Sequence, residues 1–358
     1  MMLGCKSGRV RPRAMGWGVM RGSVLGVLIL SSARLSGQQP KSPMPDSVRD
    51  YVRVAMAAFR ERSMHRAEVD WPSLEDSVVA RADSAQTPRG TWRALTWALR
   101  RVDAHSYLLP PQRVMKEFTA GMVPPVASTT ASRPVGRLLD GGFGLVVVRA
   151  HGGTNRVAYV DSLQSQIRAL DSAGVCGWVV DLRENGGGNM WPMLAGIGTL
   201  LGAEVVGSMT NSPAGEGWHY RDGRSWEGGS TPPREPLGWG SVAPRPVANA
   251  NAPVALLVGR ETASSGEITL LAFLGRPNVR SFGDSTAGMN SSNASVPLRD
   301  SATMYVTSGY PRDRLGRTYP LSVGPDELVL AGDSGSGDAA LARAVAWLGR
   351  QRACAERR

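Results

Sequence analysis

Hydrophobic residues recur with helical spacing in the first part of the chain. Between residues 45 and 117, apolar side chains lie three or four positions apart, and a second apolar segment contains Trp92, Leu95 and Leu99. This spacing places the apolar side chains on one face of each helix. The pattern predicts a small helical N-terminal segment, which we assign to residues 38–120.

The pattern changes after a stretch that is rich in proline and poor in charge, which is typical of a linker and is assigned to residues 121–137. Short β-branched runs then alternate with helical stretches, the runs at 144–148, 177–181 and 254–258 and the stretches at 159–170 and 193–201. This alternation indicates an α/β layered core, which we assign to residues 138–350. Residues 207–250 show no period and are predicted to form an irregular surface excursion.

Residues 1–37 have the order of a secretory signal peptide. Arginines through Arg21 precede an apolar run, Val24–Leu30, and small residues follow it. A membrane-spanning helix needs about 20 apolar residues, far more than this run supplies. We therefore expect cleavage near Gly37 and export to a bacterial periplasm, with no integral membrane span after processing. A retained anchor or a basic tail is the alternative.

Composition supports a folded protein and argues against one class of partner. The chain has 358 residues with 42% hydrophobic content, enough for a sizeable core. Its net charge is +11, but residues 1–37 contribute six basic and no acidic residues. The other arginines are spread singly, without the basic runs and interleaved aromatics of a nucleic-acid surface. We predict no nucleic-acid partner.

Cysteine and histidine are too sparse to indicate a cross-linked or metal-bound fold. The three cysteines are scattered and predict neither a disulfide framework nor a thiolate metal site: Cys5, Cys176 and Cys354. The four histidines are equally dispersed: His65, His105, His151 and His219. No metal or organic cofactor is expected.

Two segments at strand-to-helix passages have residues suited to catalysis. In 181–189, consecutive glycines allow backbone N–H groups to converge on an oxyanion, although a plain turn explains them equally well. In 260–268, Ser264 stands where a strand passes into a helix and is either a nucleophile or an N-cap. No lysine follows Lys116, so a base from the α/β core must be another residue type.

Together these segments resemble the tail-specific (carboxy-terminal processing) serine peptidase family. The family's Asp-Leu-Arg-x-Asn-x-Gly-Gly segment is matched by Asp181–Gly187, and its Thr-Ala-Ser-x-x-Glu segment by Thr262–Glu267. A Gly-Glu-x-Thr-x-Gly turn is matched by Gly283–Gly288 and a Val-x-Pro-Asp segment by Val323–Asp326. The resemblance covers roughly residues 95–345.

The resemblance also identifies a branch of the family. Members with a Ser-Lys dyad have lysine directly after the Thr-x-Gly turn, where this chain has Met289. The branch similar to the tricorn protease core uses a histidine in an Asp-x-His segment, which His105 matches. That branch's glutamate has no counterpart at 319–322, which leaves Asp313 and Glu267 as alternative acids.

What the resemblance implies is a ClpP/crotonase-like α/β core and hydrolysis of protein or peptide substrates. His105 would take the proton of Ser264 and return it to the leaving amine. Backbone N–H groups of Gly186, Gly187 and Ser265 would hold the oxyanion.

Two rival readings stay open. One is a catalytically silent binder of ligands or peptides on the same fold, which the missing glutamate favours and the intact Ser264 and His105 oppose. The other is a crotonase-like acyl-CoA enzyme, which leaves the Thr-Ala-Ser segment and export unexplained. The sequence between His105 and Leu145 is too short for the PDZ domain that many relatives carry.

Overall fold

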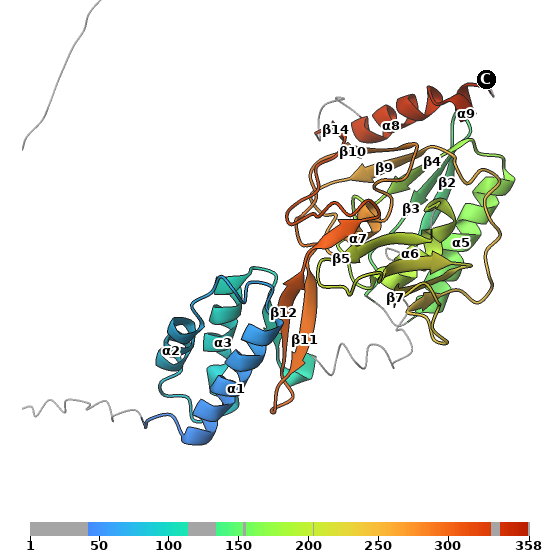
Figure 1. Ribbon diagram of the computed structural model, residues 1–358. Coiled ribbons are helices and arrows are strands. Elements are labelled where there is room, and N and C mark those ends of the chain that lie inside the picture. Colours follow the sequence, from blue (N-terminus) through green and yellow to red (C-terminus); the bar gives the residue numbers. More distant parts are fainter. Residues whose placement is uncertain (1–41, 114–133, 153–154, 203, 331–336, 357–358) are drawn as a thin grey trace, which may run out of the picture. The chain divides into compact units, whose positions relative to one another are not determined.

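The computed structural model describes residues 42–113, 134–152, 155–202, 204–330 and 337–356. The predicted signal segment and most of the predicted linker lie outside these ranges. Ser42–Arg358 form a single unit in which the described elements contact one another (Figure 1).

The predicted N-terminal helices are present as α1 (Asp46–Arg62), α2 (Trp71–Arg81) and α3 (Pro88–Val102). Their apolar faces form one buried cluster, to which Phe59 and Leu99 belong. None of the described helices has the length and hydropathy needed to cross a membrane.

A later part of the chain completes this helical segment. β1 (Tyr107–Leu109), β11 (Ser292–Pro297) and β12 (Thr303–Gly309) form an antiparallel sheet in the order β1-β12-β11. Val296, Met304 and Val306 share the buried cluster of the three helices. Figure 1 shows β11 and β12 beside α1. The hairpin β11–β12 thus supplies apolar surface that the helices need, although about 190 residues separate it from α3.

The central sheet has six strands in the order β14-β10-β9-β4-β3-β2, and only β2 is antiparallel to its neighbour. The strands are β2 (Val135–Leu139), β3 (Phe143–Val147), β4 (Gly177–Asp181), β9 (Val254–Val258), β10 (Val279–Gly283) and β14 (Glu327–Leu328). The three runs predicted from β-branched residues are β3, β4 and β9, so the α/β prediction is confirmed. β2 begins at Val135, inside the range predicted as linker.

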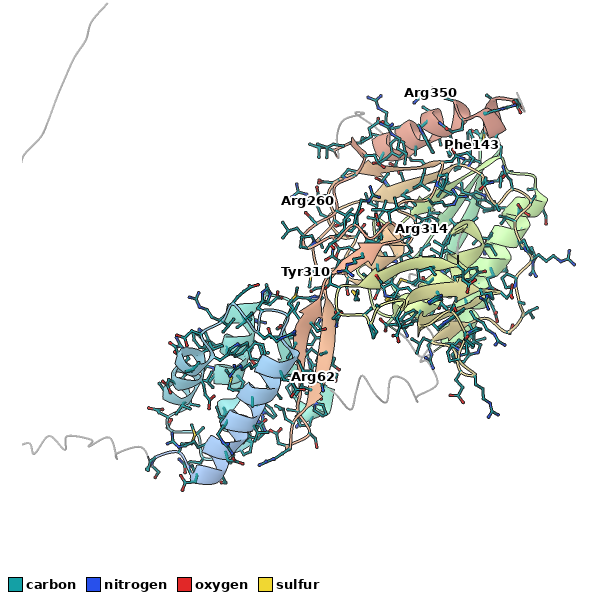
Figure 2. The ribbon with its side chains drawn as sticks, in the orientation of Figure 1. Arg62, Phe143, Arg260, Tyr310, Arg314 and Arg350 are labelled. Atoms are coloured by element: carbon teal, nitrogen blue, oxygen red, sulfur yellow. A yellow bond between two sulfur atoms is a disulfide. The ribbon has the colours of Figure 1, made fainter. Side chains whose placement is uncertain are left out.

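Helices cover both faces of this sheet. Successive strand residues point to opposite sides, so each strand packs against both helix layers. Val254, Leu256 and Val258 pack in the cluster that contains residues of α5 (Arg156–Ser172), α6 (Met190–Ile197) and α7 (Ser265–Leu271). Ala255 and Leu257 pack instead toward α8 (Ala339–Gly349) and α9 (Arg352–Ala355). Phe143, labelled in Figure 2, belongs to this second cluster.

The prediction of an irregular excursion at 207–250 is wrong for its first half. An antiparallel sheet has the order β13-β5-β6-β7-β8, in which β5 (Val205–Met209), β6 (Gly217–Arg221) and β7 (Arg224–Gly228) fill most of this half, β8 (Gly238–Trp239) is the only strand in the second half, which is described in full, and β13 (Pro311–Asp313) comes from later in the chain. Trp218 and Trp226 are each 1% exposed. The hairpin turn at Asp222-Gly223 has positive φ at both residues, which is the signature of a tight two-residue hairpin.

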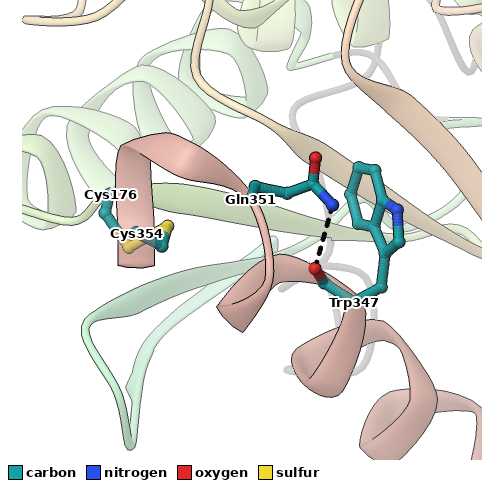
Figure 3. Close-up of a disulfide and its surroundings, with 4 residues drawn as sticks. All are labelled: Cys176, Trp347, Gln351 and Cys354. Atoms are coloured by element: carbon teal, nitrogen blue, oxygen red, sulfur yellow. Dashed lines mark hydrogen bonds between the residues drawn. A yellow bond between two sulfur atoms is a disulfide. The ribbon is translucent and has the colours of Figure 1, made fainter. Parts of the chain in front are cut away.

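The expectation that cysteines do not stabilise the fold is also wrong. Cys176 and Cys354 form a disulfide that joins residues 178 positions apart (Figure 3). Cys176 directly precedes β4, and Cys354 lies in the terminal helix α9, whose start is held by the Gln351 amide donating to the Trp347 carbonyl at 3.1 Å. Sequence spacing cannot reveal this pair, because the fold alone brings the two segments together.

Loss of this disulfide should destabilise the protein without changing its fold. Closing so long a loop in the unfolded chain contributes about 2–5 kcal/mol. We expect Cys354→Ser, and wild type in reductant, to melt at lower temperature in a chain that starts at Gln38 and so lacks Cys5. The control is Cys354→Ser with reductant, whose melting temperature should not fall further. If reductant lowered the melting temperature of Cys354→Ser as much as that of wild type, the reductant would act on something other than the disulfide.

Candidate active site

The candidate site lies at one edge of the central sheet. The segments 181–189, 259–264 and 283–291 follow β4, β9 and β10, which are neighbours in the sheet. Parallel strands place their carboxyl ends at the same edge, which is where open α/β sheets bind ligands. The motifs found in the sequence therefore meet in space.

Ser264 has an unusual backbone conformation at the start of α7. Its φ is 51° and its ψ is −120°, a region that residues other than glycine rarely adopt. Such strain persists only where the surroundings enforce it, and it is concentrated at functional sites. A sharp turn between a strand and a helix also presents the nucleophile of many α/β hydrolases. Ser264 is half-buried and is also the N-cap residue of a capping box with Glu267, so its position fits both predictions made for it.

The glycine loop that follows β4 is held beside Ser264 by one buried asparagine, which binds the preceding residue, Ala263. Asn185 is fully buried, and its amide donates to the Val148 carbonyl at 3.1 Å. Its side-chain oxygen accepts the Gly187 N–H at 3.0 Å, and its carbonyl accepts the Ala263 N–H at 3.0 Å. Gly187 has a φ of +102°, and a Cβ there would lie 2.8 Å from the Ser264 Cβ. Only glycine fits this close approach.

The three predicted oxyanion donors differ in availability. The Gly187 N–H already donates to Asn185. For the N–H groups of Gly186 and Ser265, the described residues supply no hydrogen-bond acceptor. The Ser265 hydroxyl donates to the Gly188 carbonyl at 2.6 Å, which fixes the glycine loop against the start of α7. Gly186 and Ser265 are the better-placed candidates.

Glu267, one of the two predicted acids, has its carboxylate occupied by four donors. It is fully buried and accepts hydrogen bonds from the Ser264 N–H at 2.9 Å, the Thr286 hydroxyl at 2.6 Å, and the Gly288 and Met289 N–H groups at 2.8 Å each. The carboxylate thus joins the Ser264 backbone to the turn after β10. Met289, at the lysine position of the Ser-Lys branch, has a side chain that is 46% exposed.

Asp313, the other predicted acid, is held elsewhere. Its carboxylate accepts hydrogen bonds from the Arg317 side chain at 2.7 Å and the Tyr319 hydroxyl at 2.9 Å. Burial by itself would raise the pKa of Asp313, but the hydrogen bonds from Tyr319 and Arg317 outweigh it and hold the pKa below its ordinary value. Its hydrogen bonds stabilise the turn after β13, and none of them reaches His105 in the described residues.

His105 is positioned by the turn between α3 and β1. Its backbone N–H donates to the Asp103 carboxylate at 2.8 Å, and its ring nitrogen Nδ1 lies 2.6 Å from the Ser291 hydroxyl. Burial lowers the pKa of His105 below its ordinary value of 6.5, and the negative charges of Asp103 and Glu267 oppose this only in part. The ring is therefore neutral at pH 7, as a general base must be.

No hydrogen bond joins Ser264 to His105 within the described part of the chain. The Ser264 backbone and the His105 ring nevertheless connect to the same segment after β10, since Glu267 accepts the N–H groups of Ser264 and Met289, and Ser291 contacts the His105 ring. Catalytic hydrogen bonds are often long in the free enzyme and shorten only with substrate bound. Sequence reasoning missed Ser291, because a neutral hydroxyl in a serine-rich segment carries no motif.

Some motif residues support the site from a distance. Arg183 bonds the carboxylates of Asp181 and Asp338, and the latter caps α8 by accepting the Leu341 N–H at 3.0 Å. Burial opposes the charge on Arg183, but the two carboxylates outweigh it and raise the arginine pKa. Asp326 accepts the Ser281 N–H at 2.8 Å and so attaches the Val-x-Pro-Asp segment to β10. Among the described residues, no cluster of His, Cys, Asp or Glu suits a metal ion.

The strained Ser264 and the glycine loop against it lie at the carboxyl edge of the parallel sheet, and the half-buried His105 lies in the turn between α3 and β1. The family model of peptidase family S41 matches residues 144–329, and the chain belongs to that family. It is 27% identical over 288 residues to the nisin-resistance protein of Lactococcus lactis subsp. lactis, covering 79% of this chain and 84% of that one.

Solved structures share the fold. A lipoprotein from Streptococcus agalactiae superposes with a TM-score of 0.62 at 22% identity, over 87% of this chain and 99% of that chain. The photosystem II D1 C-terminal processing protease gives a TM-score of 0.55 at 16% identity, over 86% and 98%. These likenesses confirm the tail-specific peptidase fold predicted from the motifs.

Alanine substitutions at two adjacent glycines should show whether the loop needs glycine at Gly187 for its close approach to Ser264, or glycine at any position. Gly187→Ala places a methyl group against Ser264 at positive φ and should cost about 1–3 kcal/mol and most of the reactivity of Ser264. Gly186→Ala meets no atom within 4 Å and should change stability by less than about 0.5 kcal/mol. Fluorophosphonate labelling and thermal melting measure both; equal behaviour of the two variants would contradict the close-approach argument.

Proposed function

We propose that this protein is an exported serine peptidase in which Ser264 attacks the peptide carbonyl and His105 is the general base. The observation that carries the proposal is the conformation of Ser264, whose positive φ places a serine at the sheet edge with the Gly187 loop directly against it. Membership of peptidase family S41 supports hydrolysis of protein or peptide substrates.

In the proposed reaction, the Ser264 hydroxyl gives its proton to His105 as its oxygen bonds to the substrate carbonyl carbon. Negative charge develops on the carbonyl oxygen, and the N–H groups of Gly186 and Ser265 are the proposed donors to it. His105 then passes the proton to the leaving amine, and water hydrolyses the acyl-enzyme by the same route. Glu267 and Asp313 support the structure in this scheme.

Export to the cell envelope is part of the proposal. The order of residues 1–37 supports it, and so does the disulfide Cys176–Cys354, since disulfides persist in oxidising compartments. The periplasm is the proposed compartment.

Replacement of Ser264 is the decisive test of catalysis. Ser264→Ala should lower peptide hydrolysis by about three or more orders of magnitude, because nucleophile and base act as one unit. Its melting should stay close to that of wild type. Ser265→Ala is the matched control: it loses one hydrogen bond to Gly188, worth about 1 kcal/mol, and keeps its backbone N–H, so most activity should remain.

The opposite pattern, with Ser265→Ala inactive and Ser264→Ala active, would move the nucleophile by one residue. A wild type that cleaves nothing in a broad peptide library and does not react with fluorophosphonate would favour the silent binder.

A role in nisin resistance is a second candidate, favoured by the match to most of the L. lactis protein. Resistance conferred by wild type and lost in Ser264→Ala is then the expected outcome.

The pH dependence tests the base. Because burial lowers the pKa of His105, the ring stays neutral to below pH 6.5, and kcat/KM should fall only as pH drops beneath that value. The activity is thus fully present above the pKa of the free enzyme and lost below it. His105→Ala should remove this limb together with most of the activity. A profile unchanged in His105→Ala would exclude the histidine.

A further inference from the structure

The ring of His105 contacts a hydroxyl at the place where a catalytic triad would have an acid. Nδ1 lies 2.6 Å from the Ser291 Oγ, while Nε2 has only a 3.5 Å contact with the Asn293 amide nitrogen. Asp103, the carboxylate that acts most strongly on His105, binds the backbone N–H and not the ring. The other described contacts of Asp103 are with Thr307 and His65.

The contacts at the two nitrogens fit one tautomer. Burial disfavours the imidazolium, so the free enzyme carries a single ring proton. The Asn293 amide nitrogen, a donor only, lies 3.5 Å from Nε2, and this contact fits Nε2 as the acceptor. The proton is then on Nδ1 and is donated to the Ser291 oxygen, which leaves Nε2 unprotonated and able to take the proton of a nucleophile in place of its weak contact with Asn293.

Ser291 itself is held in place by the network that binds the nucleophile. The Met289 N–H, two residues earlier, donates to Glu267, and the Asn290 amide donates to the Leu321 carbonyl at 2.9 Å. Glu267 also accepts the Ser264 N–H. The hydroxyl that contacts the base and the backbone of the nucleophile are therefore fixed by the same carboxylate.

We propose that Ser291 is the positioning residue of this site: its hydroxyl oxygen accepts a hydrogen bond from the Nδ1–H of His105, selects the tautomer with an unprotonated Nε2 and takes the place of the triad acid. The inference rests on the proposed function for its role in catalysis, but the contact and the tautomer do not depend on it.

The chemical balance is simple. The Ser264 proton passes to Nε2 as the oxygen attacks, and the Nδ1 proton stays in its hydrogen bond with Ser291 throughout. When the intermediate collapses, the Nε2 proton goes to the leaving amine. A neutral hydroxyl stabilises the imidazolium less than a carboxylate does, because charge-assisted hydrogen bonds are roughly twice as strong. The site thus has a weaker base than an acid-containing triad.

The first measurement determines the tautomer of His105. It uses nitrogen NMR of the imidazole rings in Ser264→Ala protein whose histidines carry a nitrogen label. Only four histidines are present, and His105→Ala assigns the signal. We expect the proton on Nδ1, and a shift toward the Nε2–H tautomer in Ser291→Ala. A proton on Nε2 in the parent, or a tautomer ratio unchanged by Ser291→Ala, overturns the proposal, and neither result depends on catalysis.

The second measurement is kinetic. Ser291→Ala should lower kcat about 10–100-fold with little change in KM, which is less than the roughly 10²–10⁴-fold that general base catalysis contributes, because the base itself remains. Its acid limb should move to lower pH, because the imidazolium loses an acceptor. Ser291→Thr keeps the hydroxyl and should recover most of the activity. Ser292→Ala, which removes contacts with Ser308 and Gly309 instead, is the matched control and should keep both rate and pH profile.

The outcomes separate this inference from the function it extends. Full activity and an unshifted profile in Ser291→Ala, with Ser264→Ala inactive, overturn the positioning role and leave the peptidase intact. Equal losses in Ser291→Thr and Ser291→Ala also overturn it, since the hydroxyl is then not what matters. The expected tautomer in a protein that cleaves no peptide supports the placement of Ser291 and refutes the peptidase.

Discussion

The site depends on one buried carboxylate. Glu267 is removed from water, and such a charge is tolerated only when hydrogen bonds compensate its lost hydration. Here four donors do so: three from the turn after β10, and the fourth the backbone N–H of Ser264. The compensation has a structural consequence, because the donors must converge on one point. Desolvation of a single side chain thereby fixes the start of α7 and the turn 286–289 relative to each other.

The sequence predicted the elements with strong periodicity and the residues within ordered motifs. β3, β4 and β9 were visible as β-branched runs, and Ser264 and Gly187 as members of two motifs. The predictions were wrong where the signal is weak or lies in the tertiary structure. The strands between 205 and 239 are short and separated by glycine and proline, so their alternation is masked; the Asp222-Gly223 pair was the signal that could have revealed the hairpin.

The part of the site that sequence could not supply consists of neutral partners and long-range pairs. A search for a triad acid is a search for charge, and Ser291 has none. The two acids that were proposed are buried and hydrogen-bonded, and a sequence does not distinguish a carboxylate that orients a histidine from one that holds a turn. Cys176 and Cys354 show the same limit, since their pairing follows from the position of α9 beside β4.

The hairpin β11–β12 determines which segment of this protein can fold by itself. It lies within the segment 144–329 that defines family membership, yet its apolar side chains pack with α1, α2 and α3 and its strand β12 pairs with β1. The family-matched segment is therefore not an autonomous folding unit: cut free, it would expose Val296, Met304 and Val306 to water and would lack His105. The helices before the matched segment are as much a part of the folded unit as its sheet, and a minimal version of this protein that keeps both must begin near Ser42.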